Sequence, residues 1–171
     1  VKQLQAVPGR TQIVSSDDDD ILVVVDYAHT PDALQKILQA LREQSQKQLW
    51  CVFGCGGNRD RGKRPQMAEV AATLADVVIV TSDNPRDEDP VAIIAEISAG
   101  FRNSAYRIVE DRAAAITTAI QGAHSGDVVL LAGKGHENYQ EIAGKRLPFS
   151  DITQAQLALD SRRHAMRGDV A

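Results

Sequence analysis

Short runs rich in Val, Ile and Leu alternate along the chain with longer stretches in which apolar residues recur every three or four positions. The short runs are typical of buried strands, and the longer ones of helices with one apolar face. Leu34, Leu38 and Leu41, for example, share one helical face. Thr30 and Pro31, which precede them, favour a helix N-cap and a first helical position. The pattern predicts strands at 11–14, 21–25, 49–53, 77–81, 106–109 and 128–132, helices at 63–75, 90–100 and 112–121, helices that begin near 31 and 151, and two short β pieces within 139–149.

This order of elements predicts an α/β fold built from βαβ units. We expect a single Rossmann-like domain over residues 1–171, with a mostly parallel open sheet, helices on both faces and an N-terminal β-hairpin. Aromatic residues make up only 4% of the chain, so Val, Ile, Leu and Ala must form the core. Such a core suits a parallel sheet covered on both faces, although the fold alone assigns no chemistry.

Composition and charge exclude several classes of function. The chain has 19 basic and 23 acidic side chains and a formal charge of −4, which does not favour nucleic-acid binding. It has no apolar run of about 20 residues and no signal segment, so we expect a cytoplasmic protein without a membrane partner. Because the chain begins at Val1 rather than Met, we also expect it to be part of a longer protein.

Two features permit a metal-site interpretation but favour a simpler one. The run Asp17–Asp20 lacks the spaced ligands and central glycine of a calcium loop, so we predict a solvated hairpin turn. Cys51 and Cys55 match no familiar zinc spacing, and we interpret them as small apolar residues at a strand end rather than as a metal or redox pair. We therefore predict no metal site in this chain.

Polar and glycine-rich segments follow four of the predicted strands. Because the carboxyl ends of parallel strands lie at one edge of a sheet, we expect a binding site there. Arg59 and Arg86 can clamp a carboxylate, whereas Asp83 and Glu137 can receive an ammonium group. This mixture suits a zwitterion such as an amino acid. The alternative for the arginines is a solvated surface or ion pairs with Asp60 or Asp87. The four segments are 26–31, 54–64, 83–86 and 133–137.

The glycines in 54–57 and 133–135 allow the backbone to approach a ligand. Neither segment is a phosphate-binding loop, because Gly-Lys-Gly-His at 133–136 lacks the hydroxyl residue that would hold magnesium. The chain therefore lacks the main phosphate-gripping loop of a nucleotide site. His29 and His136 lie in the strand-end segments, and we expect His124 and His164 at the surface.

Six segments in this order together resemble the C-terminal domain of the Mur ligases. They are Val7-Pro8-Gly9-Arg10, Asp26-Tyr27-Ala28-His29-Thr30-Pro31, Gly54-Cys55-Gly56-Gly57-Asn58-Arg59-Asp60, Lys63-Arg64-Pro65, Asp83-Asn84-Pro85-Arg86 and Gly133-Lys134-Gly135-His136-Glu137. The resemblance implies an ATP- and Mg²⁺-dependent ligase of peptidoglycan precursor synthesis. Asp-Asn-Pro-Arg implies that the incoming amino acid is meso-diaminopimelate and the acceptor UDP-N-acetylmuramoyl-L-alanyl-D-glutamate.

Carried over residue by residue, the resemblance implies two sets of contacts. The catalytic and nucleotide-side contacts fall on Arg10, Asp26 and His29, with Arg10 stabilising phosphate charge and the other two holding the nucleotide. The substrate-side contacts fall on Arg59, Asp83, Asn84, Pro85, Arg86, Gly133 and Glu137.

The resemblance covers only part of a ligase. The N-terminal domain for the uridine nucleotide and the central ATPase domain, which would hold most of the ATP and Mg²⁺, are absent from this sequence. We therefore predict no ligase turnover by this chain alone. Two alternatives remain at this point, a ligase that adds lysine and an amino-acid-binding module without catalysis.

Overall fold

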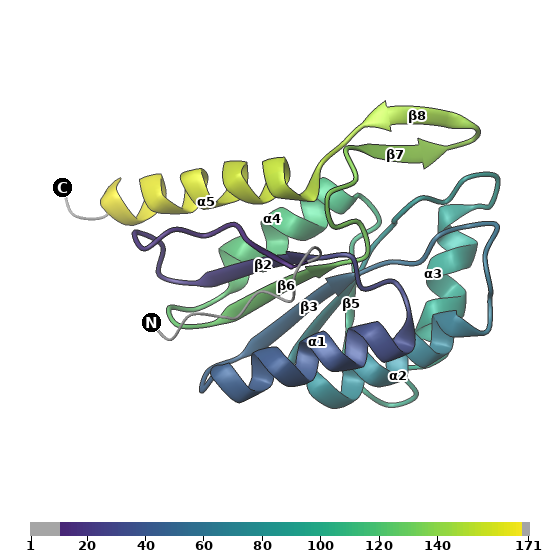
Figure 1. Ribbon diagram of the computed structural model, residues 1–171, viewed down its shortest axis with the longest axis horizontal. Coiled ribbons are helices and arrows are strands. Elements are labelled where there is room, and N and C mark those ends of the chain that lie inside the picture. Colours follow the sequence, from purple (N-terminus) through teal and green to yellow (C-terminus); the bar gives the residue numbers. More distant parts are fainter. Residues whose placement is uncertain (1–10, 169–171) are drawn as a thin grey trace.

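A six-stranded sheet runs through the centre of the computed structural model, which describes residues 11–168 (Figure 1). Its spatial order is β1-β2-β6-β3-β4-β5, and only β1 runs antiparallel to its neighbour. The expected mostly parallel sheet and N-terminal hairpin are confirmed. The strands are β1 (Gln12–Ile13), β2 (Leu22–Asp26), β3 (Leu49–Phe53), β4 (Val77–Val80), β5 (Arg107–Ile108) and β6 (Val128–Ala132).

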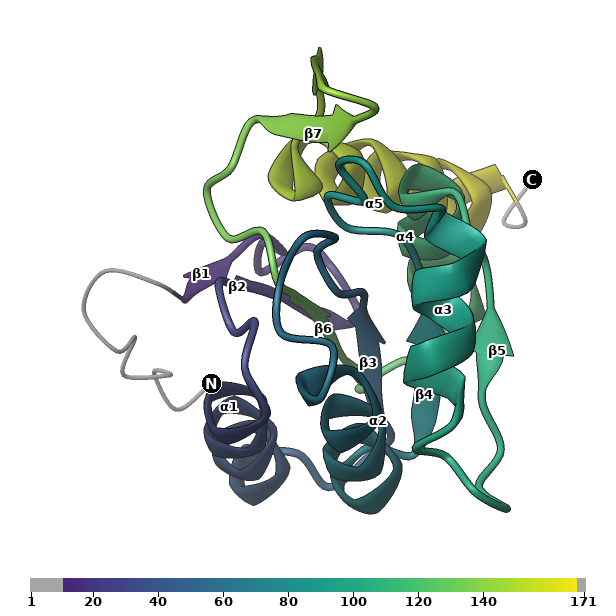
Figure 2. The same cartoon turned by 90° about the vertical axis from the view of Figure 1, so that its right-hand side faces the viewer.

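Five helices of the described residues cover the two faces of this sheet (Figure 2). Helices α1 (Pro31–Gln44), α2 (Lys63–Leu74) and α3 (Pro90–Ser98) bury their apolar residues against one face. Helices α4 (Arg112–Gly122) and α5 (Asp151–Gly168) cover the other. Successive residues of β2 alternate between the two cores, with Val24 in one and Val23 and Val25 in the other. Both faces are thus buried, as the apolar strands predicted.

Three of these helices begin with an N-cap residue whose side chain accepts a hydrogen bond from the first turn. The Thr30 side chain accepts a hydrogen bond from the Ala33 N–H, and Asp89 and Asp111 cap α3 and α4 in the same way. Each cap satisfies a backbone donor that the first helical turn leaves free. The strand-end loops consequently pass into helices at defined positions, which fixes the directions in which those loops leave the sheet.

A separate antiparallel hairpin, β7 (Tyr139–Ile142) and β8 (Lys145–Pro148), projects beyond the sheet (Figure 1). It is joined to the loop after β4, because the Arg86 N–H donates to the Glu141 carbonyl at 2.9 Å and the Ala143 N–H donates to the Arg86 carbonyl at 2.7 Å. The sequence predicted the two β pieces but not this attachment.

The turn at 17–20 is only partly solvated. Asp17 and Asp18 are exposed, as expected. The prediction is wrong for the next two residues, because α5 covers them: Asp20 pairs with Arg162 at 2.8 Å, and Asp19 lies 3.4 Å from Arg163. These ion pairs fasten the hairpin turn to α5.

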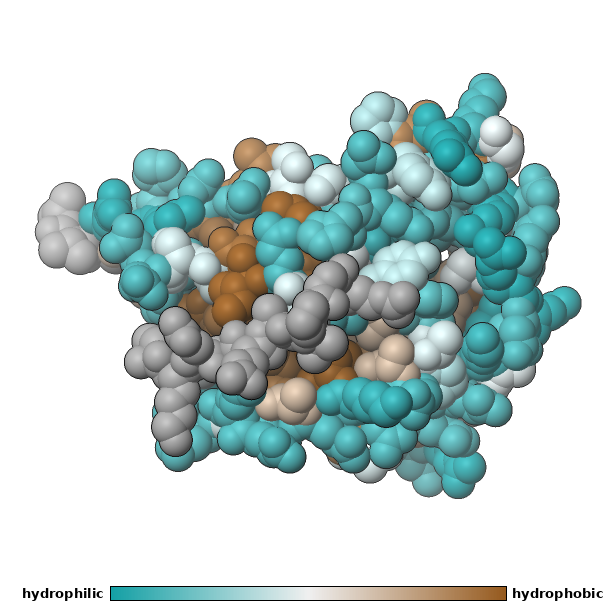
Figure 3. All heavy atoms as spheres, in the orientation of Figure 1, coloured by the Kyte–Doolittle hydropathy of each residue, from teal (hydrophilic) through white to brown (hydrophobic). Residues whose placement is uncertain are grey.

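The molecular surface is mostly polar on the side seen in Figure 3, where hydrophobic side chains gather mainly between α5 and α1. No helix within residues 11–168 combines the length and apolarity required to cross a membrane. His124 and His164 are exposed, as the sequence predicted.

Candidate functional site

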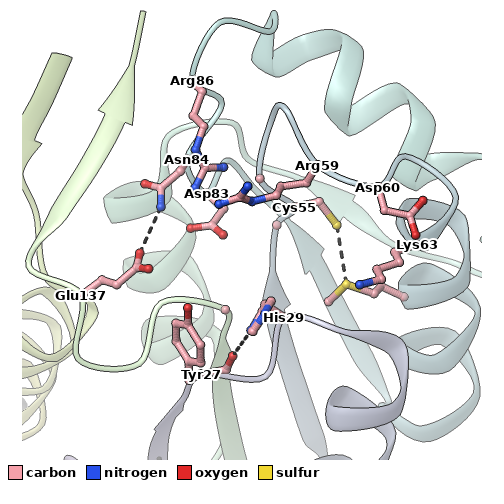
Figure 4. Close-up of a pocket in the computed structure, with 14 residues that line it drawn as sticks. Tyr27, His29, Cys55, Arg59, Asp60, Lys63, Asp83, Asn84, Arg86 and Glu137 are labelled. Carbon is pink, nitrogen blue, oxygen red and sulfur yellow. Dashed lines mark hydrogen bonds between the residues drawn. The ribbon is translucent and has the colours of Figure 1, made fainter. Parts of the chain in front are cut away.

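A pocket of about 210 Å³ lies at the carboxyl ends of the central strands (Figure 4). The loops after β2, β3, β4 and β6 all contribute to it, and these four strands are neighbours in the sheet. The expected convergence of four strand-end loops is therefore present in the structure. The pocket is lined by Tyr27, His29, Gly54, Cys55, Gly56, Arg59, Asp60, Lys63, Met67, Asp83, Asn84, Arg86, Gly133 and Glu137.

The structure brings together six of the seven residues predicted to contact the amino acid, namely Arg59, Asp83, Asn84, Arg86, Gly133 and Glu137. The seventh, Pro85, is buried beside the pocket and does not line it. These residues come from three loops, and Figure 4 shows Asn84 and Glu137 pointing toward each other on one side of the pocket, where a hydrogen bond joins them.

The predicted nucleotide-side residues are less concentrated. His29 lines the pocket, and its Nδ1 lies 2.9 Å from the Tyr27 carbonyl oxygen. Asp26 is buried outside the lining, where its carboxylate accepts hydrogen bonds from the Thr11 hydroxyl at 2.5 Å and the Ala28 N–H at 2.7 Å. Asp26 thus shapes the loop that carries His29. Arg10 lies outside the described residues.

The acidic part of the pocket is organised around a residue that the sequence did not single out as a candidate. Lys134 is completely buried, and its Nζ donates to Asn84 Oδ1 at 2.8 Å and lies 3.1 Å from Asp83 Oδ1 and 3.6 Å from Glu137 Oε2. Asn84 Nδ2 in turn donates to Glu137 Oε2 at 3.0 Å. One ammonium therefore faces two carboxylates, and this part of the pocket favours an incoming cation.

The basic part of the pocket comes from Arg59 and Arg86. Arg86 has a positive φ of 53°, and its Nη1 donates to the Gly57 carbonyl at 2.8 Å. Its Nε lies 3.6 Å from a carboxylate oxygen of Glu141 on the β7–β8 hairpin. Arg86 therefore meets Glu141 rather than Asp60 or Asp87, the two alternative partners that the sequence offered. Arg59 is exposed and has no ion pair within residues 11–168, so its guanidinium is free to meet a carboxylate.

Gly54, which lines the pocket, and Gly57, which does not, both allow close contacts within the protein. A Cβ on Gly57 would overlap the Pro85 carbonyl oxygen, and a Cβ on Gly54 would overlap the Thr81 carbonyl oxygen. The loop after β3 therefore packs directly on the loop after β4. That these glycines let the backbone approach a ligand stays a prediction.

A buried ion pair supports the pocket from behind. Arg112 donates to both carboxylate oxygens of Asp151 at 2.7 Å and to the carbonyls of Ala132 and Ser82, at the ends of β6 and β4. Burial alone would lower the pKa of Arg112, but the neighbouring carboxylates, Asp151 foremost, raise it above its ordinary value. No local sequence pattern signals this pair, because its members are 39 positions apart.

A second arginine fixes the base of the loop after β3. Arg64 is buried and donates to Glu88 at 2.9 Å through each of two nitrogens, and to the Gly56 carbonyl at 3.2 Å. The hydrogen bond from Arg64, with a further one from the Asn58 N–H, lowers the pKa of Glu88 to about 2. Arg64 thus has a structural explanation within the segment Lys63-Arg64-Pro65.

The two cysteines are free thiols. Burial raises the pKa of Cys51 to about 12, and burial together with the charge of Asp83 does the same for Cys55. Both are therefore protonated at neutral pH, which fits small apolar residues rather than nucleophiles. Within residues 11–168, no group of three His, Cys, Asp or Glu side chains is placed to hold a metal ion.

Taken together, the fold and the pocket define an α/β domain that presents a site of mixed charge, suited to a zwitterion, at the carboxyl edge of its sheet. Residues 9–135 match the family model described as Mur ligase, glutamate ligase domain. The chain belongs to this family.

Two relatives and one solved structure indicate which Mur ligases this chain is similar to. The chain is 57% identical over 160 residues to UDP-N-acetylmuramoyl-L-alanyl-D-glutamate–2,6-diaminopimelate ligase of Coxiella burnetii, covering 93% of this chain and 32% of the relative. The ligase of the same name from Synechococcus elongatus is 55% identical over 166 residues, covering 96% of this chain and 33% of the relative. A solved structure of a ligase of this name superimposes with a TM-score of 0.85 at 50% identity, covering 92% of this chain and 32% of that one. The chain thus spans about a third of the length of the relatives it matches.

Proposed function

We propose that this chain is the C-terminal, amino-acid-binding domain of an ATP-dependent ligase that joins meso-diaminopimelate to UDP-N-acetylmuramoyl-L-alanyl-D-glutamate. The observation that carries the proposal is the division of one pocket into an acidic part, Asp83 and Glu137, and a basic part, Arg59 and Arg86. The names of the similar ligases favour the same substrate. The uridine-nucleotide and ATPase domains would lie elsewhere in a cytoplasmic ligase.

Recognition of diaminopimelate follows from its difference from lysine, which is one additional carboxylate. A cation that meets this carboxylate loses that partner when lysine enters. Arg86 is suited to the role because Gly57 and Glu141 hold its guanidinium from two sides and only part of its donor capacity is used. A site built around such a donor rejects the analogue that lacks the matching group. Arg59 would provide the second cation.

In the proposed reaction, transfer of a phosphoryl group from ATP activates the D-glutamate carboxyl group of the acceptor as an acyl phosphate. The amine of diaminopimelate then attacks the acyl carbon, and the tetrahedral intermediate expels phosphate. The amine must lose its proton before the attack. The role of this chain is to bind and orient the amino acid, which lowers the barrier by making the attack effectively intramolecular.

The described residues would supply only some of the contacts that a bound nucleotide and Mg²⁺ need. They contain no three-ligand cluster for a metal, and the Asp26 carboxylate already accepts two hydrogen bonds. Mg²⁺, when bound, would neutralise phosphate charge. His29 and Asp26 would contact the nucleotide, the latter by sharing oxygens that already hold the loop, and Arg10 would stabilise phosphate charge.

The test is to replace Arg86 with Ala, and separately with Lys, in the full-length ligase. Loss of a charge pair that the bound amino acid would bury costs at least about 2 kcal/mol, so the KM for diaminopimelate should rise about 30-fold or more, while the KM for ATP stays within about twofold. Arg102→Ala is the matched control, because Arg102 is exposed and, among residues 11–168, forms an ion pair only with Glu69. Unchanged use of diaminopimelate by both Arg86 variants would contradict the assigned role.

The same enzyme separates the alternatives. A parent that prefers lysine to diaminopimelate would make it a lysine-adding ligase, and one that binds the amino acid without forming product would make it a non-catalytic module. The purified 171-residue chain should form no product from ATP and the two substrates. Turnover by that chain would overturn the proposed division of the reaction between domains.

A further inference from the structure

Lys134 is a buried charge at the wall of the pocket whose role the proposed reaction does not explain. It lies between two glycines with positive φ, 118° at Gly133 and 54° at Gly135, so the backbone makes a sharp double bend at this point. The bend directs the Lys134 side chain inward, where it is fully buried. Burying an ammonium costs free energy unless its hydrogens have partners. The partners of Lys134 therefore indicate its role.

Lys134 Nζ donates two hydrogen bonds, to Asn84 Oδ1 at 2.8 Å and to the Tyr139 carbonyl oxygen at 3.0 Å. Its third close contact is an ion pair with Asp83 Oδ1 at 3.1 Å, which is not a hydrogen bond. Because the residue is fully buried and its ammonium is surrounded by these three contacts, Lys134 is not placed to bind the substrate itself. It acts through the residues that it holds.

We infer that Lys134 is a positioning residue that fixes the orientation of the Asn84 amide and the spacing of the pocket carboxylates; this inference rests on the proposed function. Asn84 Oδ1 accepts from both Lys134 Nζ and the Glu141 N–H, the latter at 3.0 Å. With two donors on the oxygen, Nδ2 must point the other way, toward Glu137 Oε2 at 3.0 Å. The second hydrogen of Nδ2 then remains for a carboxylate of the amino acid.

The charge arrangement supports the same role. Asp83 and Glu137 lie on two loops and approach one ammonium, at 3.1 and 3.6 Å, which keeps them together despite their like charge. The buried Arg112 attracts both carboxylates from behind. Without Lys134 the two carboxylates would repel each other, and the acidic part of the pocket would open.

Lys134 also connects the β7–β8 hairpin to the loop after β4. Its bond to the Tyr139 carbonyl lies beside two other links between these segments, from Gln140 Nε2 to the Asp83 carbonyl at 2.7 Å and from the Glu141 N–H to Asn84. The hairpin is thereby docked against the same residues that face the amino acid. Loss of Lys134 should loosen this docking without disturbing the distant helices.

The kinetic test compares Lys134→Met with Lys36→Met in the full-length ligase, Lys36 being an exposed lysine that pairs with Asp32. Lys134→Met should raise the KM for diaminopimelate at least about tenfold, leave the KM for ATP within about twofold, and narrow the preference for diaminopimelate over lysine. Lys134→Arg, which keeps the charge, should fold and recover part of the loss. If Lys134 acts through Asn84, the effects of Lys134→Met and Asn84→Ala should overlap rather than multiply. Parental KM in folded Lys134 variants, or multiplicative effects, would overturn the inference.

A second measurement does not depend on the substrate. In the NMR spectrum of the 171-residue chain, the Asn84 side-chain amide should exchange with solvent slowly in the parent, quickly in Lys134→Met and at an intermediate rate in Lys134→Arg. Equally slow exchange in parent and variants would overturn the inference. A parent ligase that makes no product from diaminopimelate would instead overturn the proposed function, and the amide measurement would still decide the role of Lys134.

Discussion

The ion pair between Arg112 and Asp151 offers a quantitative test of how the pocket is supported. Both side chains are fully buried, and the two hydrogen bonds between them are 2.7 Å long. Within residues 11–168, Asp151→Ala would leave the buried guanidinium with only the carbonyls of Ala132 and Ser82 as hydrogen-bond partners. Breaking a buried pair on one side costs about 3–5 kcal/mol, because the remaining charge is uncompensated.

Thermal unfolding of the 171-residue chain measures this cost. A domain of this size loses about 2–4 °C in Tm per kcal/mol, so Asp151→Ala should lower Tm by about 6–20 °C. Glu69→Ala is the control, because it breaks the exposed pair with Arg102, and such pairs are worth at most about 1 kcal/mol. The double change Arg112→Met with Asp151→Leu should recover much of the loss, since it removes both charges. A Tm for Asp151→Ala equal to that of Glu69→Ala would refute the reasoning.

Three further predictions concern the loop after β3 and its surroundings. Gly57→Ala should lower Tm and weaken diaminopimelate binding in the full-length ligase, because the added Cβ would overlap the Pro85 carbonyl oxygen; parental values of both would contradict this packing. Glu88→Gln should lower Tm at pH 6, because the hydrogen bond from Arg64 stabilises the ionised Glu88 and lowers its pKa to about 2. The difference in Tm between variant and parent should shrink as pH falls from 4.5 toward 2, since protonation of Glu88 removes this stabilisation. A difference in Tm that stays constant over this pH range would argue against the ion pair. Cys55, with a pKa raised to about 12, should react slowly with a thiol reagent at pH 8, where about one thiol in ten thousand is ionised; rapid reaction in the folded chain would be inconsistent with that environment.

The sequence predicted the fold well because periodicity and local chemistry determine most of it. The ranges 49–53 and 128–132 coincide with β3 and β6, where every residue is buried and apolar. The cap at Thr30 also begins α1 as expected. The pocket followed from a geometric rule, since the carboxyl ends of parallel strands meet at one edge wherever the strands lie in the sheet.

The polar contacts that organise the site were not predictable in this way. Glu141 meets Arg86 across 55 positions, and Lys134 meets Asn84 across 50. Such contacts depend on how the β7–β8 hairpin folds back, and no local pattern encodes it. The sequence therefore indicated which residue types lie at the edge of the sheet but not which of them neutralise one another and which remain for a ligand.

Strand order explains why a glycine is required at position 54. In the sheet β3 lies between β6 and β4, so the loop after β6 reaches the loop after β4 only by passing over the end of β3. The residue at that end is Gly54, whose carbonyl oxygen lies 3.9 Å from the Cβ position of Gly133. Any side chain at Gly54 would already overlap the Thr81 carbonyl oxygen and would crowd this passage. Gly54 thus permits the approach of these two loops, and the contact between Lys134 and Asn84 depends on that approach.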